Sequence, residues 1–134
     1  MIELEFVVWE FVRLMVELEE SSNSPARDKS GGAYTAWREP WQELDTRLAD
    51  LGARDANEFA NLMMEQVVTV PCTSRRQLKA AVDALIRVAV KLKKEIRQAR
   101  GDIDRIEELE FERAELDSLI ERLRSIDPSA LKNA

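Results

Sequence analysis

Apolar residues recur along residues 2–20 at a spacing that fits a helix better than a strand. With about 100° per residue, one face carries Leu4, Val7, Val8, Phe11, Leu14, Met15 and Leu18. A second apolar face carries Ile2, Phe6, Trp9, Val12 and Val16. The alternation around Glu3 and Glu5 would also permit a strand over residues 2–8, but it fails at Val7 and does not continue. The pattern therefore favours a helix throughout this segment.

A helix that is apolar on two sides cannot cover both sides with one neighbour. We expect this helix either at the centre of a bundle or at an interface between proteins. If the second face is open, Phe6 and Trp9 are its anchors and charged residues such as Arg13 form its rim. The predicted protein interface consists of Phe6, Trp9, Val12, Arg13 and Val16.

The next segments predict two shorter helices after a polar connector. Residues 21–32 lack a large apolar side chain, so we expect a mobile surface loop there. A helical stripe follows, made of Tyr34, Trp37, Trp41, Leu44, Leu48 and Leu51. Pro40 fits the first turn of a helix that Gly52 would end, with residues 34–39 as a preceding or kinked turn.

Asp55 and Glu58 match a capping pair and open a third helix, which should carry Phe59, Leu62, Met63, Gln66 and Val67 and end before Pro71. The aromatic residues of the preceding stripe could stack on a base or hold a peptide. Because leucines continue their stripe, burial in the core is the favoured interpretation. Of Tyr34, Trp37 and Trp41, we expect Trp37, just ahead of Pro40, to be the most exposed.

Two long helices of opposite charge are predicted for the C-terminal half. Ser74 and Gln77 cap a helix over residues 75–100, and a second apolar stripe follows over residues 102–126. Gly101 permits either one continuous helix or a tight antiparallel hairpin. The first helix carries nine basic residues against two acidic ones, and the second nine acidic against four arginines. A hairpin would place these charges side by side, so we favour the hairpin.

These elements predict an all-α, single-domain bundle of about five helices with a C-terminal antiparallel helical hairpin, over residues 1–134. Residues 127–134 should form a frayed tail. The hydrophobic fraction of 45% in 134 residues is ordinary for a globular domain. No positively charged start precedes the first apolar stretch, and Glu10, Arg13 and Glu17 interrupt it, so we expect neither a secretory signal nor a spanning helix.

The residues that carry chemistry are few. The chain has no histidine, which removes the commonest general base and metal ligand, so we expect no enzyme activity, no metal site and no cofactor. Cys72 is the only cysteine, which excludes an intramolecular disulfide and fits a reducing cytoplasm. It precedes a helix start and Arg75 and Arg76, which would lower its thiol pKa, so it is a possible reactive thiol. Without a second cysteine or a nearby base, a packed thiol is the favoured interpretation.

The leading hypothesis is a non-enzymatic helical interaction protein, either a homo-oligomer or a subunit or adaptor of a larger protein assembly. The first alternative is a nucleic-acid-associated protein or ribonucleoprotein subunit that uses the basic helix at residues 75–100. Its candidate contacts are Lys79, Arg87, Lys91, Lys94 and Arg97. The net charge of −6 opposes binding to nucleic acid or anionic membranes by the molecule as a whole. The second alternative is an acidic regulator or inhibitor that binds a basic protein site.

Overall fold

The computed structural model describes residues 1–22 and 32–131. Its elements follow the order β1 (Ile2–Val7), α1 (Val8–Ser22), α2 (Ala33–Arg54), α3 (Ala56–Glu65), β2 (Val67–Cys72), α4 (Arg75–Gln98), α5 (Ile103–Arg124) and the short 3-10 helix η1 (Pro128–Ala130). The all-α prediction is confirmed: the structure is 78% helical, with five α-helices and one small two-stranded sheet in the described part. The loop predicted at residues 21–32 falls largely outside the described residues, and its mobility stays a prediction.

The two short strands correct the prediction of helix at both places. β1 pairs antiparallel with β2, with Leu4 opposite Val70 and Phe6 opposite Val68. Leu4 and Phe6 are buried, whereas Glu3 and Glu5 are exposed, which is the alternation of a half-buried strand. The partner strand is rich in valine, which packs well on a pleated surface. Pairing with this distant segment overrides the helical spacing of residues 2–7, and it also ends α3 before Val67.

α1 begins where a carboxylate of its first turn accepts a hydrogen bond from the amide just before the helix. The backbone N–H of Val7 donates to Oε1 of Glu10 at 2.7 Å. A glutamate three residues into the helix that reaches back to the residue before it is one half of a capping box. Glu10, which interrupts the apolar pattern of this segment, therefore fixes the point at which the strand ends and the helix begins.

α2 is one helix that passes through both residues expected to limit it. Pro40 lies inside the helix rather than at its first turn, and Gly52 lies within it rather than ending it. Trp37 is fully buried, contrary to the expectation that it is the most exposed aromatic residue. Its Nε1–H donates to the backbone oxygen of Pro71 at 2.6 Å, which fastens α2 to β2.

The hairpin prediction is confirmed, as are the predicted helix caps. Gly101 has φ of +87°, a conformation in which a side chain would be strained, and Asp102 caps α5 by accepting from the N–H of Arg105 at 3.1 Å. Asp55 and Ser74 cap α3 and α4 in the same way. The C-terminal tail does not fray up to residue 131, because η1 packs back and Leu131 is buried.

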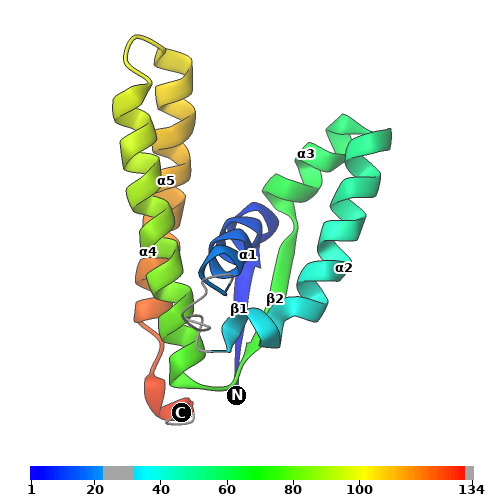
Figure 1. Ribbon diagram of the computed structural model, residues 1–134, viewed down its shortest axis with the longest axis vertical. Coiled ribbons are helices and arrows are strands. Elements are labelled where there is room, and N and C mark those ends of the chain that lie inside the picture. Colours follow the sequence, from blue (N-terminus) through cyan, green and yellow to red (C-terminus); the bar gives the residue numbers. More distant parts are fainter. Residues whose placement is uncertain (23–31, 132–134) are drawn as a thin grey trace.

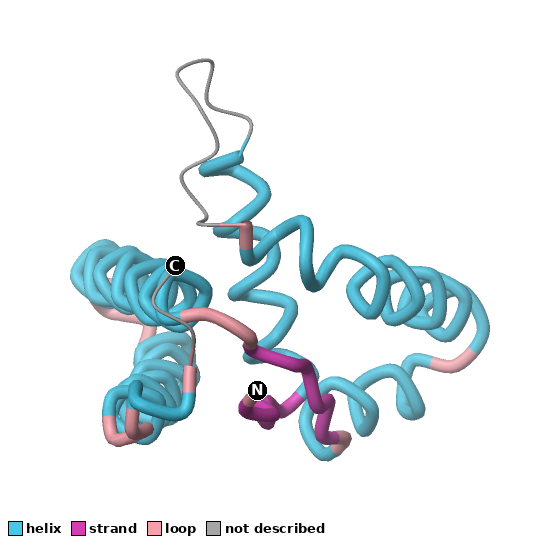
Figure 2. Tube along the Cα trace, turned by 90° about the horizontal axis from the view of Figure 1, so that it is seen from below, coloured by secondary structure: helices cyan, strands magenta, loops and turns pink. Residues whose placement is uncertain are grey.

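α1 lies at the centre of the molecule. The α4–α5 hairpin stands on one side of it, and the sheet with α2 and α3 lies on the other (Figure 1, and from below in Figure 2). α1 contacts α2, α3, α4 and both strands. Its Phe11 packs against Phe6 and Trp41, with ring centroids 5.7 and 6.3 Å apart. The two flanking units thus form two arms that share α1 as their common support.

Two glycines should respond in opposite ways to alanine. Gly101→Ala should lower the free energy of unfolding by about 1–2 kcal/mol, because alanine is strained at positive φ. Gly52→Ala should raise it by about 0.5–1 kcal/mol, because the new methyl group meets the Phe59 ring at an ordinary 3.6 Å within a helix. Urea unfolding measures both variants, and a loss of stability in Gly52→Ala would show that α2 does not continue through this position.

Candidate protein-binding groove

α1 keeps part of its circumference uncovered between the two arms. Its inner side is buried at Phe11, Leu14, Met15 and Leu18. Between the arms this helix presents Val12, Arg13 and the exposed Val16, together with Trp9, which is itself buried. Because they recur at steps of three and one, they form a single stripe along the helix. Four of the five residues predicted as an interface are therefore brought together.

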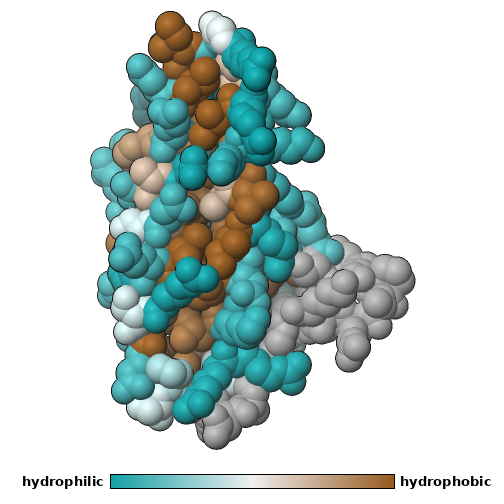
Figure 3. Space-filling view, turned by 90° about the vertical axis from the view of Figure 1, so that its left-hand side faces the viewer, coloured by the Kyte–Doolittle hydropathy of each residue, from teal (hydrophilic) through white to brown (hydrophobic). Residues whose placement is uncertain are grey.

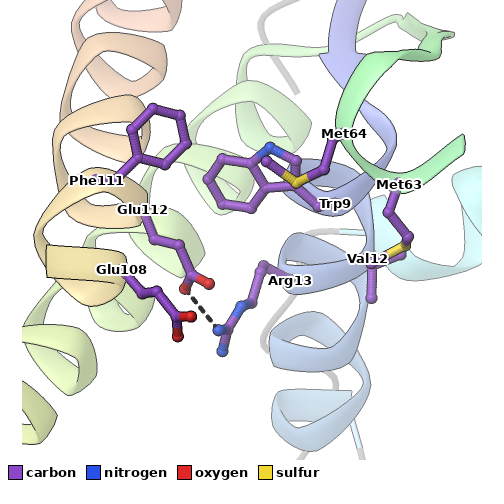
Figure 4. Close-up of a pocket in the computed structure, with 8 residues that line it drawn as sticks. All are labelled: Trp9, Val12, Arg13, Met63, Met64, Glu108, Phe111 and Glu112. Carbon is purple, nitrogen blue, oxygen red and sulfur yellow. Dashed lines mark hydrogen bonds and ion pairs between the residues drawn. The ribbon is translucent and has the colours of Figure 1, made fainter. Parts of the chain in front are cut away.

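The first part of the uncovered stripe is the floor of an apolar groove. A cavity of about 380 Å³ lies between α1, α3 and α5. Its lining residues are Trp9, Val12, Arg13, Met63, Met64, Glu108, Phe111 and Glu112. Figure 4 shows Trp9 from α1 between Met64 of α3 and Phe111 of α5. The side chains of Met64 and Phe111 are large and apolar, yet 51% and 53% exposed. Such exposed apolar walls over a buried tryptophan are typical of a binding surface.

A second cavity, of about 360 Å³, continues along α1 beside α4. It shares Val12 and Arg13 with the first and adds residues of α1 and α4. The added residues are Val16, Glu17, Glu20, Val88, Lys91, Leu92 and Glu95. Both cavities lie along the same face of α1, and together we call them the α1 trough. Nη2 of Arg13 and Oε2 of Glu112, 2.8 Å apart, connect α1 to α5 at the shared part.

Glu17 fixes the hairpin to α1 through a buried carboxylate. It accepts from Nε of Arg87 at 3.0 Å and from Nζ of Lys91 at 2.6 Å. Lys91 also reaches Glu20 at 3.3 Å. The hydrogen bond with Glu17, and then that with Glu20, raises the pKa of Lys91 above its ordinary value although partial burial lowers it. The trough wall formed by α4 is therefore held in place by charge pairs as well as by apolar contact.

The charge pairing expected within the hairpin occurs mainly elsewhere. In residues 1–22 and 32–131, the ion pair between α4 and α5 joins Arg105 to Glu95 at 3.6 Å, with the basic residue on the acidic helix. Two basic residues of α4, Arg87 and Lys91, pair with α1 instead. The hairpin forms as predicted, but attraction between its two helices is not the main role of its charges.

Several predicted site residues take other roles. Phe6 is fully buried in β1, so it belongs to the core and cannot anchor a partner. Trp9 is mostly buried and presents only part of its ring at the trough floor. Of the basic candidates on α4, Lys79 pairs with Asp83 at 2.6 Å, and both Arg87 and Lys91 bind Glu17. Lys94 and Arg97 are exposed.

Cys72 does not have the environment of a reactive thiol. It is buried in β2, and its Sγ–H donates to the backbone oxygen of Ser74 at 3.5 Å. Burial, the largest influence on this group, raises the pKa of the thiol. The expectation of a lowered pKa from the nearby helix start and arginines is therefore wrong.

Met64 and Phe111 are site residues that the sequence prediction missed. Phe111 lies off the buried stripe of α5, among glutamates, and Met64 follows Met63, which the pattern assigned to the core. In the sequence, Phe111 is a single large apolar residue on an otherwise charged helix face, which is an ordinary feature of protein surfaces. Phe111 becomes part of a site only because the folded chain places α1 and α3 opposite it.

The described residues contain no group of three or more histidine, cysteine or acidic side chains placed to hold a metal ion. In the same part of the chain, the helices are too short or too polar to cross a bilayer. The chain matches no protein-family model, no characterised protein and no solved structure.

Glu17→Ala should lower the free energy of unfolding by about 1–2 kcal/mol. The variant removes a buried carboxylate, while the partly exposed Arg87 and Lys91 regain contact with water, which limits the loss. Urea unfolding compares it with Glu19→Ala, an exposed neighbour that should change stability by less than about 0.5 kcal/mol. Equal effects of the two variants would contradict a specific role of Glu17.

Glu10 should make the fold sensitive to pH. Burial raises the pKa of Glu10, although the Val7 amide and the charge of Arg122 oppose this effect. The folded state therefore binds this proton more tightly than the unfolded state, so the resulting stability is present at acidic pH and is lost as pH rises through the folded pKa. Glu10→Gln, which can still accept from Val7, should be more stable than the wild type at pH 7 and similar to it at acidic pH. Urea unfolding at both pH values, with exposed Glu3→Gln as control, tests this. Lower stability of Glu10→Gln at pH 7 would contradict it.

Proposed function

We propose that this protein is a non-enzymatic helical interaction protein that binds the apolar face of a partner protein's helix in the α1 trough. The observation that carries the proposal is the exposure of Met64 and Phe111 on two separate arms, on either side of Trp9. Side chains of this size gain most from a partner that covers all of them together. Methionine is also suited to binding because its flexible side chain adapts to the surface placed on it.

The shape of the trough favours a helix as the bound element. The stripe from Trp9 to Glu20 extends for about 16 Å at 1.5 Å per residue, the length of about three helical turns. Beside Trp9 and Val12 the walls come from α3 on one side and α5 on the other, and farther along α1 the wall comes from α4. A groove of this form takes an amphipathic helix through apolar residues at steps of three and four.

The trough rim favours a partner with basic rather than acidic flanks. Its lining contains five glutamates, Glu17, Glu20, Glu95, Glu108 and Glu112. Arg13 and Lys91 also lie in the lining. Part of the negative charge is neutralised because Arg87 pairs with Glu17, and Arg105 pairs with Glu95 and Glu108. The remaining negative charge is small, so it would act on orientation and partner choice more than on affinity.

Nucleic-acid binding through α4 stays a prediction with less support. Three of its five candidate residues are engaged in ion pairs, and two of those bind α1. A phosphate would have to displace these carboxylates before it could bind.

A photo-crosslinking amino acid placed at Met64 in the native host tests the proposal. We expect crosslinks to a segment of a different protein, mapped by mass spectrometry, whose sequence has an apolar helical face. The segment, made as a labelled peptide, should bind the purified protein in a fluorescence anisotropy titration. Met64→Glu and Phe111→Glu should each weaken its binding at least ~10-fold, which corresponds to about 1.4 kcal/mol.

Val90→Glu is the matched control, because Val90 is similarly exposed but lies outside the trough. It should leave peptide binding unchanged, and circular dichroism should show all three variants folded. Crosslinks that join only copies of this chain, crosslinks to nucleic acid, or a peptide that binds all variants equally would each contradict the proposal.

A further inference from the structure

The hairpin carries a second apolar surface on the side away from α1. In Figure 3, an apolar band runs along this outer face between polar margins. A shallow groove of about 370 Å³ lies on it, lined by residues of both helices. The apolar members of its lining are Ile86, Ala89, Val90 and Ile120. Val90 is 61% exposed, and Ile103, near the tip of the hairpin, is 71% exposed.

This outer face is separate from the α1 trough. Arg87 and Lys91 reach from α4 toward Glu17 of α1, whereas Ile86, Val90 and Lys93 line the groove on another side of the same helix. The sheet, α2 and α3 lie beyond α1, on the far side from this face (Figure 1). Another molecule can therefore cover the outer face without entering the trough.

The two margins of the outer face differ in charge. Lys93 lines the groove on α4, and helical spacing from it places Arg97 and Arg100 on the same side of this helix. The same spacing places Glu110, Asp117 and Glu121 along the margin of α5, where Arg113 and Arg124 also line the groove. Arg113 lies 3.8 Å from Asp117 within its own helix. Within the described ranges, Lys93, Arg97 and Glu110 take part in no ion pair, so these charges are available to a neighbour.

We propose that the outer face binds a second copy of the chain, so that two hairpins form a four-helix bundle. In a two-fold dimer the same surface covers itself, and the direction of the axis decides which helices meet. An axis parallel to the hairpin places α4 of each copy on α5 of the other, so unlike margins meet. An axis that lies in the interface at a right angle to the helices places α4 on α4 and α5 on α5, so like charges meet. The charges therefore select the parallel axis.

The area of the outer face is sufficient for a dimer. Helices of about 22 residues are roughly 33 Å long, and two adjacent helices are about 20 Å wide, which gives roughly 600 Å² per copy. Two copies would bury about 1,200 Å², the lower end of the range for specific interfaces. The small apolar core and the charged margins agree with the anatomy of such an interface.

Light scattering behind a sizing column, over a tenfold range of concentration, tests the dimer on the full chain. The wild type should have twice the monomer mass of 15.4 kDa. Val90→Glu should have the monomer mass and keep its helicity, whereas Met64→Glu, in the trough, should remain dimeric. A monomeric wild type or a dimeric Val90→Glu would overturn the proposal. Because Met64→Glu disables only the trough, this result is independent of the proposed binding of a partner helix.

Charge reversal tests the direction of the axis. One variant carries Lys93→Glu and Arg97→Glu on α4, and the other carries Glu110→Arg and Asp117→Arg on α5. Each variant alone should have a dimer dissociation constant at least ~10-fold higher than that of the wild type. An equal mixture of the two variants should form dimers that contain one chain of each. If the α4 variant instead pairs best with the wild type, like helices face each other and the parallel axis is wrong.

Discussion

The apolar residues of α1 extend around more of the helix than one neighbour can cover, and the positions of the other elements follow from this constraint. Phe11 and Trp41 meet on the side of α2, and the strands close the same core through Leu4, Phe6 and Val70. α4 covers another side of α1. α1 therefore joins the two arms, which also contact each other directly between α2 and α4 and through the hydrogen bond from Arg122 to the backbone oxygen of Glu5.

The same constraint produces the candidate site. Two arms fixed to opposite sides of a helix leave the part between them open, and Trp9, Val12, Arg13 and Val16 lie there. Glu17 sets the position of one arm, because its buried carboxylate binds two basic residues of α4. The trough is thus a consequence of how the core is closed, and its walls are set by contacts that also stabilise the fold. The outer face of the hairpin is a second surface with an apolar centre, and its charged margins make it suited to a symmetrical partner.

Local signals in the sequence predicted the local features well. Gly101 marked the break between the last two helices, and Asp55 and Ser74 predicted two helix starts, because caps and turns depend on neighbouring residues. The features that depend on distant residues were missed. β1 pairs with the distant β2, and Trp37 is buried where Pro71 of β2 accepts its N–H. Phe111 faces a groove that three separate elements form. The opposite total charges of the two helices predicted that α4 lies beside α5. They did not predict that Arg87 and Lys91 of α4 bind α1.

The most direct test of the central role of α1 is native-state hydrogen exchange of its backbone amides. If both arms depend on α1, the amides of Phe11, Leu14 and Met15 should exchange only through global unfolding, with the free energy found by urea denaturation. Amides near Gly101, at the tip of the hairpin, should exchange through smaller openings. Exchange of the α1 amides at a much lower free energy than those of α4 would show that the hairpin is stable without α1, and would contradict this account.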